Sequence, residues 1–114
     1  MVQLAPSKDN TLYESGTGAL SNGAGDFLFA GQTQNFNLTR RAVLSFDLVA
    51  AGIPAGATVT SVTLEMDVSR SQQANTENVS LHRLTQDWGE GTSNASANEG
   101  GGAPSTTGDA TWIH

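Results

Sequence analysis

The stretch Ser61-Val62-Thr63-Leu64-Glu65-Met66-Asp67-Val68-Ser69 alternates apolar and polar residues along its whole length. Successive side chains of an extended strand point to opposite faces, so the four apolar residues of this stretch share one face. These four residues are Val62, Leu64, Met66 and Val68. The opposite face carries Glu65 and Asp67 and is expected to meet water. The pattern predicts a strand whose apolar row lines the interior of a two-layer β architecture.

Weaker alternation predicts further strands on both sides of this stretch. The expected strands are Asp9 to Glu14, Asp26 to Ala30, Arg41 to Leu48 and Asn78 to Leu84. In the third of these, Ala42, Leu44, Phe46 and Leu48 fall on one side, opposite Val43, Ser45 and Asp47. Leu12 is the expected anchor of the first.

No segment keeps a helical apolar period for three turns. Turn signals separate the expected strands, among them Ser21-Asn22-Gly23 and Gly52-Ile53-Pro54-Ala55-Gly56. Short strands joined by such turns, without helices, indicate an all-β fold. The expected architecture is an antiparallel jelly roll or β-sandwich.

The chain of 114 residues suits one domain, here residues 1–114. A long loop rich in Gly and Ser, residues 89–108, offers almost nothing to bury and separates Trp88 from Trp112. After it, Thr111-Trp112-Ile113-His114 is expected to open a strand, where the sequence given ends. We therefore expect a sandwich that is incomplete at its C-terminus. The missing strands would come from a longer chain or from a neighbouring copy.

Composition narrows the classes of partner. The net charge is −6 and only five residues are basic, which argues against nucleic acid. No apolar run approaches the ~20 residues that span a bilayer. Charged residues make up 14%, and neutral polar side chains supply most of the polarity. Such a surface is typical of extracellular β-proteins, so we expect an extracellular or cell-surface location, with any signal peptide absent from this sequence. The chain has no cysteine, which excludes disulfides and thiolate metal sites.

Several motifs occur in an order that resembles a known family. They are Asp9-Asn10-Thr11-Leu12-Tyr13-Glu14, Phe27-Leu28-Phe29-Ala30-Gly31, Arg40 to Leu48, Ile53 to Ala57, Val59 to Leu64, Trp88-Gly89-Glu90-Gly91 and Ala110-Thr111-Trp112. Together they resemble the DNRLRE-type domain. The resemblance implies a secreted β-sandwich of the carbohydrate-binding-module type. Family members continue beyond the Thr-Trp element with several further strands, which this sequence lacks.

Two kinds of ligand site are expected around the long loop. Trp88 and Trp112 are candidates for stacking on sugar rings, although the simpler explanation is that both close the core of the sandwich. Asp87, Glu90 and Asp109, with loop carbonyls and Asn94 or Asn98, are the candidate ligands of a structural Ca²⁺ ion. A second acidic group comprises Asp9, Glu14 and Asp26 with Asn10 and Asn22. The alternative for both groups is local hydrogen bonding in turns.

Catalysis is not expected. His82 and His114 share no motif with a carboxylate, and the neighbours Glu65 and Asp67 have no identifiable partner. Three glycosylation sequons begin at Asn37, Asn78 and Asn94 and matter only in a glycosylating host.

The first hypothesis is therefore a non-catalytic extracellular module that binds polysaccharide or has a structural role at the cell surface. The alternative is a structural assembly subunit, part of a surface filament or homo-oligomer, that is completed by a strand from another copy of the protein.

Overall fold

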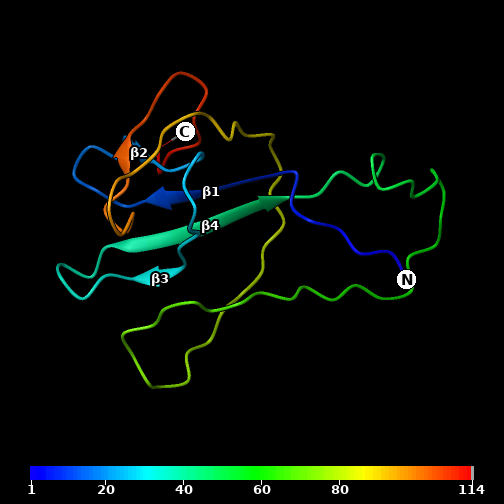
Figure 1. Ribbon diagram of the computed structural model, residues 1–114, viewed down its shortest axis with the longest axis horizontal. Helices are drawn as coiled ribbons and strands as arrows, with labels where there is room; N and C mark the ends of the chain where they lie inside the picture. Colours follow the sequence, from blue (N-terminus) through cyan, green and yellow to red (C-terminus); the bar gives the residue numbers. More distant parts are fainter. Residues whose placement is uncertain (114) are drawn as a thin grey trace.

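A computed structural model describes residues 1–113, and this part of the chain contains strands and no helix (Figure 1). The strands are β1 (Lys8–Tyr13), β2 (Leu20–Ser21), β3 (Gly31–Gln32), β4 (Thr39–Ser45) and β5 (Ala103–Pro104). All pairings are antiparallel. The expectation of an all-β fold is confirmed. No helix of the described residues has the length and apolar character to cross a membrane.

The larger sheet has the order β1-β4-β3. Strands β1 and β4 pair from Lys8↔Ser45 to Tyr13↔Arg40, so the predicted strands at 9–14 and 41–48 are real, with shifted bounds. Strand β4 stops before Asp47 because this side chain accepts a hydrogen bond from the Ala50 N–H at 2.8 Å. That contact holds a turn instead of extending the ladder.

The smaller sheet pairs β2 with β5, in the register Leu20↔Pro104 and Ser21↔Ala103. It draws the segment 89–108 back against the first third of the chain. The expectation that this segment buries almost nothing is wrong, since Ser93, Ala95 and Glu99 are all buried. Within it, the Ser93 hydroxyl accepts a hydrogen bond from the Gly23 N–H at 3.4 Å, and the Asn94 amide donates to the Ala24 carbonyl at 2.9 Å.

The interior is small and unusually polar. Tyr13 is fully buried and donates its hydroxyl to the Glu99 carbonyl at 3.0 Å. The other side chains excluded from water to the same degree are polar, namely Asn10, Thr11, Ser21 and Asn22. Leu12, the expected anchor of β1, is half-buried, and Val43 is the buried residue of β4. The face of β4 that carries Ala42 and Leu44 is therefore more exposed to solvent than the face that carries Val43.

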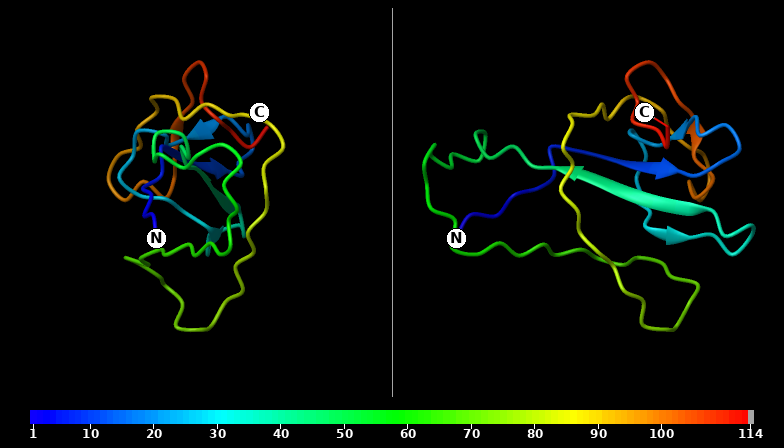
Figure 2. Two further views of the ribbon diagram at one scale, coloured as in Figure 1. Left: turned by 90° about the vertical axis from the view of Figure 1, so that its right-hand side faces the viewer. Right: turned by 180° about the vertical axis from the view of Figure 1, so that it is seen from behind.

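Residues 57–86, here called the excursion, leave both sheets in a wide loop (Figures 1 and 2). The strands predicted at 61–69 and 78–84 are wrong for this chain, because the described residues supply them with no strand partner. The apolar row faces solvent, with Val62 85% and Val68 75% exposed. Val79 is likewise 78% exposed. Residues 7–45 and 88–113, which contain all the strands of the described residues, are called the paired region.

The excursion expands the whole molecule. The radius of gyration is 15.3 Å, whereas a compact chain of this length is expected near about 13 Å. The space between the excursion and the larger sheet is therefore open.

Two further expected strands are absent from the described residues. At 26–30 the N–H groups of Asp26 and Phe27 donate to the Glu99 carboxylate, and that of Phe29 donates to the Thr11 hydroxyl. Side-chain acceptors thus take the place of a strand ladder. At 111–113 the backbone turns at Trp112 and Ile113. His114 lies outside the described residues.

Candidate functional site

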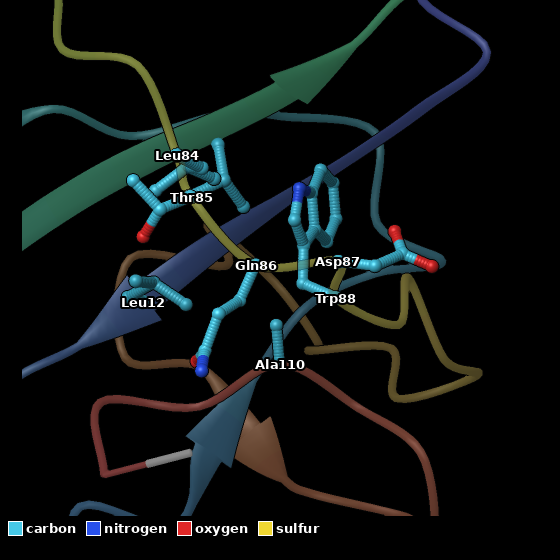
Figure 3. A pocket seen from close by; sticks show the side chains of 8 residues that line it. Leu12, Leu84, Thr85, Gln86, Asp87, Trp88 and Ala110 are labelled. Atoms are coloured by element: carbon cyan, nitrogen blue, oxygen red, sulfur yellow. The ribbon is translucent and has the colours of Figure 1, made fainter.

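A small cavity lies over the face of the larger sheet, beside Trp88 (Figure 3). Its volume is about 200 Å³. Leu12 of β1 and Val43 of β4 form the floor, and the walls come from residues 84–88, where the excursion joins the paired region, and from Ala110. The wall residues of that segment are Leu84, Thr85, Gln86, Asp87 and Trp88. An apolar floor with a few polar groups at the rim is the usual composition of a ligand site.

Lys8 contacts Asp87 and Trp88, two of the residues that line this cavity. Its ammonium group donates to the Trp88 carbonyl at 2.5 Å and to the Asp87 carboxylate at 2.7 Å. The same nitrogen lies 4.8 Å from the centroid of the Trp88 ring. A cation over an aromatic face is attracted by the negative face of the ring. Lys8 also lowers the pKa of Asp87, chiefly through the hydrogen bond.

Trp112 makes the equivalent contact with a second basic residue, Arg41. The Arg41 guanidinium carbon lies 4.7 Å from the centroid of the Trp112 ring. In the register of β1 and β4, Arg41 pairs with Leu12, and alternation places Lys8 and Leu12 on one face. Both tryptophans are therefore associated with the same sheet face. Lys8 and Leu12 are four residues apart, a separation of about 13 Å along a strand.

The three candidate calcium ligands have separate partners. Asp87 binds Lys8, and Glu90 accepts a hydrogen bond from the Asp9 N–H at 2.9 Å. Asp109 accepts from the N–H groups of Thr92 at 2.9 Å and Thr106 at 2.7 Å. Its carboxylate therefore ties together the two ends of a loop.

Burial and hydrogen bonding act in opposite directions on Asp109. Burial disfavours its charged form, but donors from Thr106, Ser93 and Thr92 outweigh this effect, so the pKa of Asp109 is lowered. Ionised Asp109 is a structural group whose oxygens are already occupied by protein donors.

Among residues 1–113, no three acidic or histidine side chains are gathered closely enough to hold a metal ion. In the second acidic group, Glu14 accepts from the Thr39 N–H at 2.7 Å, while Asn10 and Asn22 enter the interior. Calcium binding stays a prediction from the sequence. Of the groups considered for catalysis, His82, Glu65 and Asp67 are exposed on the excursion, apart from the cavity.

Sequence reasoning missed a buried hydrogen-bond network between the two sheets. The Asn10 amide donates to the Ser21 hydroxyl and to the Glu90 carbonyl, both at 2.8 Å. Asn22 donates to the Glu99 carboxylate at 2.8 Å. Burial raises the pKa of Glu99, but hydrogen bonds from Asn22, Asp26 and Phe27 outweigh it and the net shift is downward. The available signal was the Asn22-Gly23 turn, which predicted a turn and not a buried amide.

Comparison with known proteins identifies no relative. No family model matches the chain, and searches of curated proteins and of solved structures found no match. The resemblance to the DNRLRE-type domain therefore stays a prediction from the sequence.

Proposed function

We propose that this chain is a non-catalytic structural module of an extracellular β assembly, whose sandwich is completed by pairing with a neighbouring copy. The observation that carries the proposal is the excursion. Within the described structure, residues 58–69 and 77–86 make no backbone–backbone hydrogen bond. Extended backbone with free N–H and C=O groups and an alternating apolar row is a template for strand addition.

The open space beside the excursion supports this proposal. It measures about 4500 Å³, several times the roughly 300–1,000 Å³ of a ligand pocket. Apolar side chains line it from the sheet and from the excursion. They include Leu44, Phe46, Val62, Leu64, Met66 and Leu81. A gap of this size and character fits a further layer of polypeptide better than a small molecule.

The apolar row and the charges of the excursion together favour one self-pairing register. If two copies of 61–69 pair antiparallel with Leu64 opposite Leu64, Val62 faces Met66 and the apolar rows share a face. On the other face Glu65 then lies opposite Thr63 and Asp67 opposite Ser61. A centre at residue 63 pairs Met66 with Thr60 and so loses an apolar contact, whereas centres at residues 65 and 66 place carboxylates opposite each other, which is destabilising. A two-fold pair of this kind is self-complementary.

Disulfide trapping tests the register directly, because the chain has no native cysteine. Leu64→Cys is expected to give covalent dimers on mild oxidation, since cross-strand neighbours have suitable Cβ separations. Glu65→Cys, one residue along and on the opposite face, is the matched control and should crosslink much less. Light scattering of the unmodified chain should show a dimer or larger assembly.

A monomer at all concentrations, with both cysteine variants uncrosslinked, would contradict pairing between copies. Efficient crosslinking through Glu65→Cys with none through Leu64→Cys would contradict the proposed register.

The cavity beside Trp88 favours a second candidate function, the binding of carbohydrate. An aromatic wall with Gln86, Asp87 and Thr85 nearby combines a stacking surface with hydrogen-bonding groups. The acidic, weakly charged composition suits a neutral polysaccharide.

Affinity electrophoresis in gels containing neutral or acidic polysaccharides tests this second function, with and without Ca²⁺. Trp88→Ala should abolish retardation and Trp112→Ala should weaken it less, since Trp112 does not line the cavity. Unretarded migration in every gel would exclude carbohydrate binding and leave the structural role.

A further inference from the structure

The fold holds Asn22 through both ends of its side-chain amide. The nitrogen donates to the Glu99 carboxylate at 2.8 Å, and the oxygen accepts from the Ala95 N–H at 2.8 Å. The side chain is 2% exposed. An amide is required here because one end donates and the other accepts, which a carboxylate cannot do.

The residue after Asn22 is equally constrained. A Cβ at position 23 would overlap the Glu90 carbonyl oxygen, and one at position 25 would overlap the Asn22 amide itself. Gly23 is therefore imposed by close packing of backbone against backbone. The structure requires an Asn-Gly dipeptide at the centre of its polar interior.

Asn-Gly is also the dipeptide most prone to spontaneous deamidation, because glycine adds no side chain to hinder its backbone nitrogen. We propose that Asn22 is a latent deamidation site, protected while the segment 93–99 is docked and converted when that segment opens. The conversion would then act as an irreversible latch, since the product no longer fits the docked segment.

The chemistry needs water alone as co-reactant. The Gly23 backbone nitrogen attacks the Asn22 side-chain carbonyl carbon, loses its proton, and forms a five-membered succinimide. The carbon–nitrogen bond of the side-chain amide breaks, and ammonia leaves. Water then opens the ring to aspartate or isoaspartate at position 22.

The docked structure hinders each part of the first step. The Asn22 side chain is fixed by Glu99 and Ala95, and the Gly23 N–H is directed at the Ser93 hydroxyl at 3.4 Å. Reaching the succinimide requires release of these contacts, which come from segment 93–99, and of the longer hydrogen bond from the Asn22 amide to the Phe27 carbonyl at 3.4 Å. The reaction rate thus reports how often that segment opens.

The product would oppose redocking. Aspartate at position 22 places a carboxylate against the Glu99 carboxylate, where the amide nitrogen had donated. Two like charges at hydrogen-bond distance in a buried site are strongly unfavourable. Tyr13 also lies near Glu99, but it supplies no positive charge that could offset the repulsion between the two carboxylates.

The first experiment measures conversion at Asn22 by peptide mapping and mass spectrometry after incubation of the full chain at mildly alkaline pH. Conversion should be about tenfold or more slower in buffer than in urea, because buffer keeps the segment docked. Asn94, followed by Ala95, and Asn98, followed by Glu99, are internal controls and should convert more slowly than Asn22 in urea.

The second experiment tests the latch with variants. Asn22→Asp should lower the urea midpoint of unfolding, and adding Glu99→Gln should recover part of the loss, since the Gln amide can donate to the new carboxylate. If Asn22→Asp does not fold, recovery in the double variant still reports the contact.

Equal conversion of Asn22 in buffer and in urea would overturn the protection. An unchanged urea midpoint for Asn22→Asp, or no recovery in the double variant, would overturn the latch.

Discussion

The paired region and the excursion have similar apolar alternation in sequence and opposite fates in the structure. The segment that forms β4 finds strand partners on both sides, in β1 and β3. Residues 61–69 alternate more regularly, yet they find no strand partner in the described structure and leave Val62 and Val68 facing solvent. The difference shows that alternation specifies which face of a strand is apolar, and that ladder partners decide whether a strand forms.

The two regions also differ in what stabilises them. The paired region depends on buried amides, hydroxyls and carboxylates that are nearly all hydrogen-bonded, together with one buried tyrosine. The excursion exposes a series of large apolar side chains, among them Val62, Met66, Val68, Val79 and Leu81. Contacts in the paired region should therefore dominate the stability of the isolated chain, and the excursion should matter in an assembly.

The largest expected effect tests this division at Tyr13. Tyr13→Ala removes a fully buried ring and its hydrogen bond to Glu99, so unfolding in urea should lose about 3–5 kcal/mol. Val62→Ala in the excursion should change the stability of the dilute monomer by less than about 0.5 kcal/mol. A loss at Val62 that matches the loss at Tyr13 would mean that the excursion is packed within the single chain.

Close packing at glycine gives the next effect. Gly91 has a φ of 74° and a Cβ there would overlap the Asp109 carboxylate, so Gly91→Ala should cost about 2–3 kcal/mol. Gly101→Ala is the matched control, since no atom lies near its Cβ position. Thermal or urea unfolding of the pair measures the difference. Equal stabilities would show that the loop tied by Asp109 is loosely held.

The pH dependence of stability should reveal the stabilising contribution of ionised Asp109. Its pKa is lower in the folded chain than the ordinary value of 3.8, so its contribution is complete above that pH. The contribution is lost as the pH falls below 3.8 through the folded pKa. Asp109→Asn should therefore be less stable near neutrality and show a shallower loss on acidification. Parallel acid profiles for the two proteins would contradict this role.

Apart from the control substitutions Val62→Ala and Gly101→Ala, the smallest effect is expected at Lys8. Lys8→Gln removes the cation over the Trp88 ring, which should cost about 0.5–1 kcal/mol. Because the excursion re-enters the paired region at Trp88, the same change should loosen this junction. Increased quenching of Trp88 fluorescence, measured in a Trp112→Phe background, would detect the loosening. Unchanged quenching would indicate that other contacts hold Trp88.

Prediction from the sequence succeeded where an alternating segment pairs with another such segment in a regular ladder. Two predicted strands are found, one around Asn10 to Tyr13 and one around Arg41 to Ser45. Both show local alternation, and a regular antiparallel pair is stabilised by the side-chain packing that such alternation permits. The strand at 26–30 was wrong because side-chain acceptors on Thr11 and Glu99 capture its backbone N–H groups. These acceptors are side chains and not a second alternating segment, and Glu99 lies more than seventy residues away, so no local pattern predicts them.

The candidate site shows the same limit. Trp88 and Asp87 could be selected from the sequence by residue type, but Lys8 could not, since its contact with them spans about eighty residues.

By itself, the amino-acid sequence determined the all-β class, the absence of thiol chemistry, the acidic balance and the two longest strands. These follow from composition and from local alternation, which act within a few residues. Tertiary structure alone decided that Asn22 and Glu99 meet in the interior, that Trp88 lies over Lys8, and that residues 61–69 have no strand partner within the described chain. The physical reason is that a hydrogen bond or a ladder needs a second group, and where that group lies is set by the path of the whole chain.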